Sequence, residues 1–124
     1  GIRSYEEDES NLLNELNVHC ITMQQVNCHD LTGLLSGLRK HVLRHADVFA
    51  ISLDIDAIDP EDAPAVGVPE PGGIKGRALC EALKQFKADP LYLGLEVAEF
   101  SPEFDQADKT LRLISNLVTA LYGI

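Results

Sequence analysis

Two aspartates that stand two positions apart, Asp54 and Asp56, are the residues whose types and spacing point most directly to chemistry. They end a nearly continuous apolar run, residues 48–55. On an extended strand, residues two apart point to the same side, so the spacing predicts that both carboxylates project together. Two like charges this close repel each other, and a divalent cation is the natural compensator. The pair is therefore a candidate metal site.

A purely structural role for these aspartates stays open from the pattern alone. An aspartate at a strand end is often a cap or a turn former, and Asp59-Pro60 is typical of a turn. The DxDxxD run is not an EF-hand loop, because that loop needs Asp or Asn at its fifth position and Gly at its sixth. This sequence has Ile58 and Asp59 there.

The elements around the aspartates alternate between strand and helix patterns. Apolar runs rich in β-favouring residues predict buried strands at 48–55 and 91–97, and shorter strands are expected at 1–3 and 18–23. Ser4 and Glu7 form a capping-box pattern that predicts the start of the first helix. Apolar residues at helical spacing predict four helices. These residues are Leu12, Leu13 and Leu16; Leu31, Leu34, Leu35, Leu38 and Val42; Ala78, Leu79, Ala82, Leu83 and Phe86; and Leu111, Ile114, Leu117, Val118 and Leu121.

The order β-α-β-α-β-α-β-α predicts an α/β fold, a three-layer α/β/α arrangement with a parallel sheet. Residues 57–73 are so rich in proline and glycine that they predict a long, stiff loop. Ligands of open parallel sheets bind outside the carboxyl ends of the strands. That loop and a second acidic segment, residues 96–102, both follow strands, so the site is expected at this edge.

Composition excludes several classes of function. The chain has 124 residues, 45% of them hydrophobic and 24% charged, which fits one ordinary globular domain. Its net charge of −10 disfavours binding to nucleic acid and to anionic lipid. No stretch approaches the roughly 20 apolar residues that a membrane span needs. We therefore expect no nucleic-acid and no membrane partners.

The cysteines and histidines are weaker candidates for chemistry. Three cysteines, Cys20, Cys28 and Cys80, form an odd and sparse set, so we expect free thiols in a reducing, cytoplasmic compartment. Cys20 and Cys28 lack the CxxC spacing and the second half of a zinc site. His41 and His45 have a spacing that can bind metal, but they are expected in the last turn of a helix, where cationic side chains suit the helix dipole.

The whole run that contains the aspartates is far more specific than its first six residues. SLDIDAIDPEDAPAVGVPEPGG, residues 52–73, closely resembles the signature of the ureohydrolases, the superfamily of arginase, agmatinase and formiminoglutamase. GIRS, residues 1–4, resembles a strand opening of that family, and GLEVAEFSP, residues 94–102, its next-to-last active-site segment. The resemblance covers essentially all 124 residues.

This resemblance implies an α/β/α fold in which two adjacent manganese ions activate a bridging hydroxide that attacks a guanidinium or formimidoyl carbon. Asp54 matches the carboxylate that bridges both metals, and Asp56 matches one that chelates a single metal. Glu99 matches the carboxylate that interacts with the substrate's guanidinium group. Hard carboxylate ligands suit Mn²⁺, and paired metals lower the pKa of bound water. The partners expected are a small-molecule substrate and further copies of the same protein in a homo-oligomer.

Part of the family pattern is absent. A GGDH-type and a DAHxD-type segment, which complete the family's metal site, do not occur in this sequence. Residues 1–124 are therefore expected to be the carboxyl-terminal portion of a single ureohydrolase-type domain, inactive in isolation. Val68 stands where many members have Thr, which leaves the substrate less defined than the reaction class. GIRS and the complete aspartate loop resemble arginases or agmatinases more than formiminoglutamases, and they favour an arginase-like enzyme.

Two other functions stay open at this stage. A phosphorylation receiver domain has this length and an aspartate where Asp54 stands, but it needs a late-strand lysine where this chain has Glu99, and it lacks a loop as long as residues 57–73. A catalytically inactive ureohydrolase-like scaffold is the second alternative, because fold does not guarantee function. The joint presence of Asp54, Asp56 and Glu99 argues against that scaffold.

Overall fold

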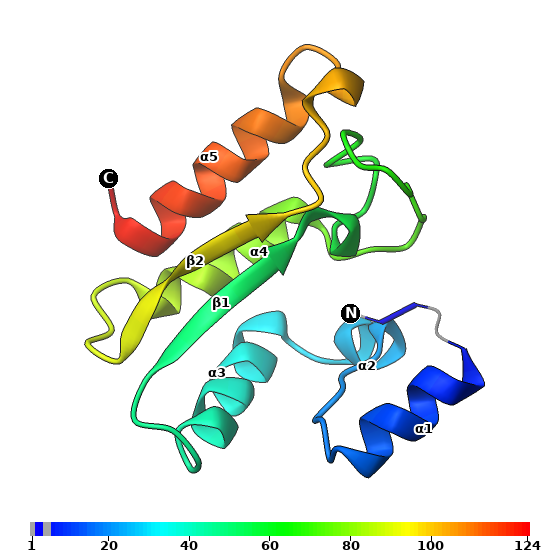
Figure 1. Ribbon diagram of the computed structural model, residues 1–124. Helices are drawn as coiled ribbons and strands as arrows, with labels where there is room; N and C mark the ends of the chain where they lie inside the picture. Colours follow the sequence, from blue (N-terminus) through cyan, green and yellow to red (C-terminus); the bar gives the residue numbers. More distant parts are fainter. Residues whose placement is uncertain (1, 4–5) are drawn as a thin grey trace.

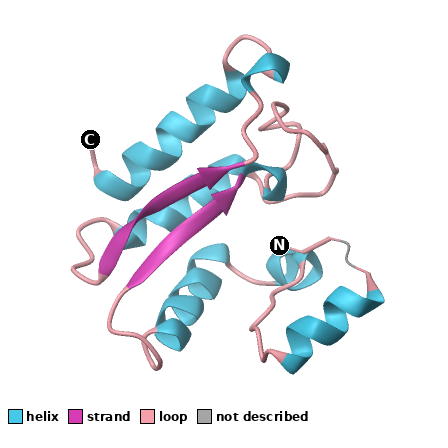
Figure 2. Cartoon of the chain, in the orientation of Figure 1, coloured by secondary structure: helices cyan, strands magenta, loops and turns pink. Residues whose placement is uncertain are grey.

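A computed structural model describes residues 2–3 and 6–124 of the chain. Two parallel strands lie at its centre, with helices packed along them (Figures 1 and 2). The strands are β1 (Phe49–Asp54) and β2 (Tyr92–Ala98). The helices are α1 (Glu7–Glu15), α2 (Met23–Cys28), α3 (Leu31–Val42), α4 (Gly76–Leu83) and α5 (Lys109–Tyr122), with 3-10 turns η1 (Ile55–Ala57), η2 (Lys84–Phe86) and η3 (Pro102–Phe104).

The sheet confirms the two longer predicted strands and the α/β class with parallel pairing. Phe49 lies opposite Tyr92, and Leu53 lies opposite Val97. Phe49 and Leu53 are buried, whereas Ser52, which lies between them in the sequence, is exposed. Among the described residues, β1 is thus covered on one face only, whereas its nearly continuous apolar run predicted a strand covered on both faces.

The core lies between the sheet and three helices. α4 packs between α3 and α5, and Figure 1 shows α4 running behind the two strands. The predicted apolar stripes of these helices supply the contacts to β1. α5 ends at Gly123, whose φ of 70° is the left-handed cap that glycine adopts without strain. The core residues from α4 and α5 are Leu79, Leu83, Leu117, Ala120 and Leu121.

The amino-terminal part differs from the prediction. Strands were predicted at 1–3 and 18–23; over residues 2–3 and 18–23, which the structure describes, a single parallel bridge joins Ile2 to Thr22 instead. A strand needs a partner along its length, and here only one residue pair meets. Thr22 instead caps α2, which the sequence analysis missed: its hydroxyl accepts from Gln25 N at 3.4 Å, and its N–H donates to Gln25 Oε1 at 2.9 Å.

Helix α1 begins close to its predicted start. Ser4, half of the predicted capping box, lies outside the described residues. The N–H of Glu6 donates to the Glu9 carboxylate at 2.9 Å, so the helix is capped by acidic residues. The leucines expected on its apolar face are largely uncovered, with Leu12 54% and Leu16 64% exposed.

The long loop after η1 is held together by Asp59, which the sequence predicted as a turn residue. Its carboxylate accepts hydrogen bonds from Glu61 N at 3.0 Å and Gly72 N at 3.2 Å, and it lies 3.2 Å from Lys75 Nζ. The hydrogen bond from Glu61, assisted by Lys75 and Gly72, holds the pKa of Asp59 below its ordinary value. One side chain therefore ties both ends of the loop together.

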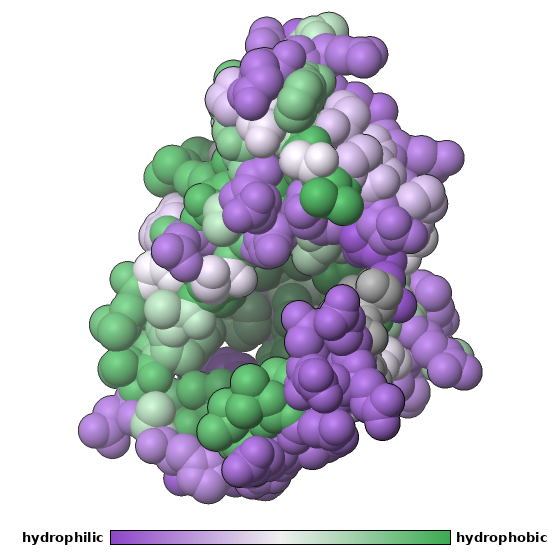
Figure 3. Space-filling view, turned by 45° about the vertical axis from the view of Figure 1, so that its right-hand side comes forward, coloured by the Kyte–Doolittle hydropathy of each residue, from purple (hydrophilic) through white to green (hydrophobic). Residues whose placement is uncertain are grey.

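The surface is hollowed on one face, and hydrophobic side chains line the hollow (Figure 3). Between α3 and β1 lies a mainly apolar groove of about 390 Å³. Leu35 and Leu38 of α3 line it together with Ile51 and Leu53 of β1. No helix among the described residues is long and apolar enough to cross a membrane.

Candidate active site

Asp54 and Asp56 lie at the carboxyl end of β1, but not in the predicted geometry. β1 ends at Asp54, and Asp56 lies in the η1 turn that follows. The pair therefore does not share one face of an extended strand. Instead, the carboxylate of Asp54 accepts a hydrogen bond from the N–H of Asp56 at 2.8 Å. The two acidic side chains are brought together by a turn rather than by strand alternation.

Asp56 is the more enclosed of the two aspartates. Its Oδ1 is buried and has no hydrogen-bond partner among the described residues. Burial raises the pKa of Asp56, and the nearby charges of Asp54 and Glu99 raise it further, while Arg3 lowers it. Such an environment disfavours an extra negative charge and favours a bound cation.

Glu99 follows the carboxyl end of β2, the neighbouring strand. Its side chain is exposed, and its φ of 61° places the backbone in the left-handed region. A non-glycine residue pays about 1–2 kcal/mol for that conformation. The conformation turns the chain sharply at the end of the strand, on the same edge of the sheet as Asp54, which pairs with Ala98. The negative charge of Glu99 contributes to the raised pKa of Asp56, which indicates that the two carboxylates lie within electrostatic range of each other.

The segment that carries Glu99 is joined to the loop that follows the aspartates. Ser101 N donates to the carbonyl of Ala65 at 2.9 Å. Ala65 N in turn donates to Thr110 Oγ1 at 3.0 Å, and both residues are fully buried. Asp105 caps the start of α5 by accepting from Thr110 N and Leu111 N, each at 2.9 Å. The loop, the Glu99 segment and α5 are therefore linked behind the site.

Arg3, which the sequence analysis did not single out, contacts the backbone of the candidate site. Its Nη2 donates to the carbonyl of Asp56 at 2.6 Å, and its Nη1 donates to the carbonyl of Ala57 at 3.2 Å. Its Nε is buried without a partner among the described residues. The only signal in the sequence was its place in the GIRS segment, because these contacts span more than 50 positions.

The donor set fits a hard divalent cation. Two carboxylates supply oxygen ligands, and the orphaned Asp56 Oδ1 is a buried acceptor that needs a positive partner. Over residues 2–3 and 6–124, no group of three or more His, Cys, Asp or Glu side chains is arranged to hold an ion. Asp54 and Asp56 by themselves would therefore be an incomplete ligand set.

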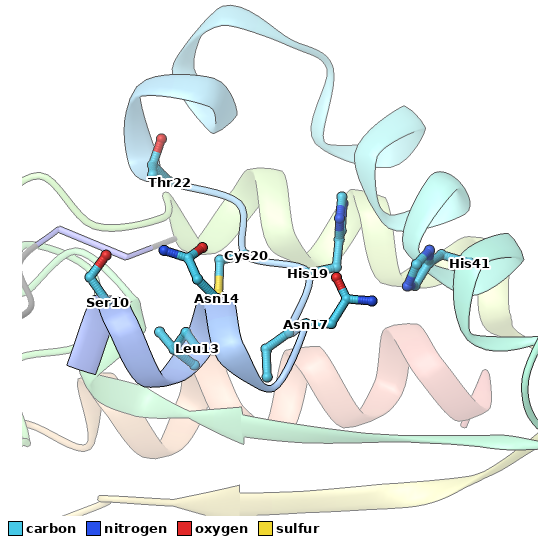
Figure 4. Close-up of a pocket in the computed structure, with 9 residues that line it drawn as sticks. Ser10, Leu13, Asn14, Asn17, His19, Cys20, Thr22 and His41 are labelled. Carbon is cyan, nitrogen blue, oxygen red and sulfur yellow. The ribbon is translucent and has the colours of Figure 1, made fainter. Parts of the chain in front are cut away.

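The histidines cluster away from the aspartates. His41 lies in the last turn of α3, and its ring stacks on that of His19 at 4.9 Å between centroids. His45, which was expected in the same turn, lies beyond the helix end, with its ring 5.7 Å from that of His41. His19, His41 and Cys20 border a cavity of about 270 Å³ beside α1 (Figure 4).

Comparison with known proteins identifies the class of protein. The Arginase family matches residues 1–123, and the chain belongs to this family. It is 29% identical over 123 residues to an arginase of Bacillus caldovelox, and 31% identical to an arginase of Agrobacterium fabrum. These alignments cover 99% of the chain, but 41% and 38% of the two relatives.

Solved structures show the same fold. The structure of the Bacillus caldovelox arginase is similar with a TM-score of 0.91 at 28% identity, over 99% of this chain and 41% of that one. A formimidoylglutamase of Bacillus subtilis is similar with a TM-score of 0.87 at 26% identity, over 94% of this chain and 36% of that one. The chain therefore has part of the arginase-like α/β fold and spans about two fifths of the length of these relatives.

Proposed function

We propose that residues 1–124 are the carboxyl-terminal portion of a ureohydrolase domain and supply part of a binuclear manganese site. Asp54 and Asp56 act as metal ligands, and Glu99 binds the substrate. The observation that carries the proposal is the buried, unpartnered Asp56 Oδ1, held beside Asp54 and near Glu99 at the carboxyl edge of the sheet. Family membership supports the same assignment.

The remaining ligands of this site come from the part of the protein outside this chain. Carboxylate oxygens suit Mn²⁺, and a metal pair would supply a nucleophile from water near neutral pH. The chain's own residues hold the oxygen ligands in place: η1 fixes Asp56, and the Asp56 N–H orients the Asp54 carboxylate. Weak metal binding and no turnover are therefore expected for residues 1–124 in isolation.

The substrate class is a small molecule with a guanidinium or formimidoyl group. Hydrolysis of a guanidinium C–N bond consumes one water and releases urea and an amine. The Glu99 carboxylate accepts hydrogen bonds from the cationic nitrogens of such a group, a charge-assisted contact. Arginases among the relatives favour a guanidinium substrate, and formimidoylglutamases are the alternative. We also propose a cytoplasmic homo-oligomer for the complete protein.

The test is metal analysis combined with two product assays on the complete protein. We expect two Mn²⁺ per chain and urea release from arginine. Formamide release from formimidoylglutamate, with no urea, would move the assignment to the other substrate class. A complete protein that folds but binds no Mn²⁺ and releases neither product would overturn the proposal in favour of an inactive scaffold. The receiver-domain alternative is wrong, because the Arginase family match extends over residues 1–123.

A further inference from the structure

The η1 turn is fixed by a side chain from the far end of the sequence. Arg3 donates to two consecutive carbonyls, those of Asp56 and Ala57, at 2.6 and 3.2 Å. A guanidinium presents its N–H donors in a rigid planar fork, so two adjacent acceptors are held in one orientation. The two carbonyls belong to the residue that carries the carboxylate, Asp56, and to the next residue, Ala57. Fixing their position limits the directions in which the Asp56 carboxylate can point.

Arg3 itself is anchored by the bridge beside it. Ile2 accepts a hydrogen bond from Met23 N at 3.0 Å and donates to Ile21 O at 3.4 Å. The arginine side chain therefore starts from a backbone tied to the start of α2 and reaches across to the end of β1. This contact joins the amino-terminal helices to the turn that carries the acidic pair.

The guanidinium of Arg3 binds the main chain of the η1 turn and does not bind the Asp56 carboxylate. Both described hydrogen bonds of Arg3 go to carbonyl oxygens, and Asp56 Oδ1 has no partner among the described residues. An arginine paired with the carboxylate itself would compete with a metal for the same oxygen. The observed arrangement instead orients the carboxylate and keeps its buried oxygen open to a cation.

We propose that Arg3 is a positioning residue that fixes the Asp56 carboxylate for metal binding by clamping the backbone of the η1 turn. The inference rests on the proposed manganese site and adds a residue that is not itself a ligand. Groups that orient metal ligands typically change metal affinity by about 10–100-fold when they are removed.

The test compares Arg3→Met with the wild type in the complete protein, by calorimetric titration of the metal-free form with Mn²⁺ at about pH 8, well above the ordinary carboxylate range. We expect the Kd for Mn²⁺ to rise by about 10–100-fold. Removing a positive charge near a cation site would by itself tighten binding. Unchanged or tighter binding in a folded Arg3→Met protein therefore overturns the clamp and assigns Arg3 an electrostatic effect at most.

Controls separate this inference from the proposed function and from general instability. Arg112→Met removes the same charge from an exposed position on α5, and its Kd should equal that of the wild type. If Arg3→Met fails to fold, Arg3→Lys is used instead, because lysine keeps the positive charge but lacks the planar guanidinium fork. A raised Kd for Mn²⁺, with an unchanged thermal midpoint of the metal-free protein, supports the clamp. A Kd equal to that of the wild type overturns it. Absence of Mn²⁺ binding by the wild type would instead reject the proposed function.

Discussion

The carboxylate of Asp54 accepts a hydrogen bond from the backbone N–H of Asp56 at 2.8 Å, so one acidic residue of the pair sets the start of the turn that holds the other. Asp54 consequently has two separable roles. One is local, as the acceptor that caps η1, and the other is the negative charge that we propose for metal binding. An asparagine can keep the first role and lose the second.

Asp54→Asn and Asp54→Ala should therefore differ in stability but not in metal content. The asparagine oxygen still accepts from Asp56 N, so Asp54→Asn should keep the thermal midpoint of the metal-free protein. Asp54→Ala removes the acceptor and should cost about 1 kcal/mol. Both should lose most bound Mn²⁺, measured by elemental analysis of the complete protein. Two metals and normal turnover in Asp54→Asn would show that Asp54 is a turn residue only.

Glu99→Gln tests the proposed substrate contact. It keeps the side-chain shape and removes the charge that would face a guanidinium group. In the complete protein, kcat/KM should fall by about 100-fold or more, close to 3 kcal/mol of transition-state stabilisation, while both metals stay bound. Loss of metal in this variant would recast Glu99 as a support of the metal site, and near-normal kcat/KM would remove it from substrate binding.

Asp59 should make the long loop sensitive to acid. Its pKa is lowered in the folded protein, so its stabilising contribution is present above the unfolded value, about 3.9, and is lost as the pH falls through the lower folded pKa. Asp59→Asn should thus lower the thermal midpoint most near neutral pH, and the gap from the wild type should close in acid. Thermal melts between about pH 3 and 7 measure this gap. Asp47→Asn, at an exposed position, is the control, and an equal gap at every pH would contradict the prediction.

Gly73→Ala should destabilise the same loop through a clash. A Cβ at residue 73 would lie 2.5 Å from Asp59 N and 2.5 Å from the carbonyl carbon of Ile58. Both are backbone atoms, so the chain must shift, at a cost of about 1–3 kcal/mol. Gly67→Ala in the same loop meets nothing within 4 Å and should be nearly neutral. Denaturant unfolding of both variants measures the difference, and equal stabilities would mean that the loop has room to adjust.

Much of the fold was predictable because its elements carry strong local patterns. The apolar runs gave β1 and β2, and the helical stripes gave α3, α4 and α5. The short α2 was missed because six residues are too few for a stripe, although the Thr22–Gln25 capping pair marks its start. The prediction of two short strands at the amino-terminal end was wrong, because strand pairing depends on distant partners, which the local sequence does not encode.

In the candidate site, too, local features were predictable from the sequence and long-range contacts were not. Asp54 and Asp56 stand out as acids after an apolar run, so their presence at the strand end was predictable. Their mutual geometry was not, since it depends on the chain leaving the extended conformation at Ile55. The contact of Arg3 with the η1 turn spans 53 positions and joins a cation to carbonyl groups, which every residue carries. Periodicity and spacing hold no information about such a contact.

The two-stranded sheet leaves strand edges that affect how the chain behaves in solution. Among residues 2–3 and 6–124, β1 and β2 pair only with each other, so each strand presents an outer row of unpaired N–H and C=O groups. Neither strand contains lysine or proline, the residues that commonly block edge-to-edge association, and Leu93 on β2 is 70% exposed. Residues 1–124 expressed by themselves should therefore self-associate by strand addition as their concentration rises.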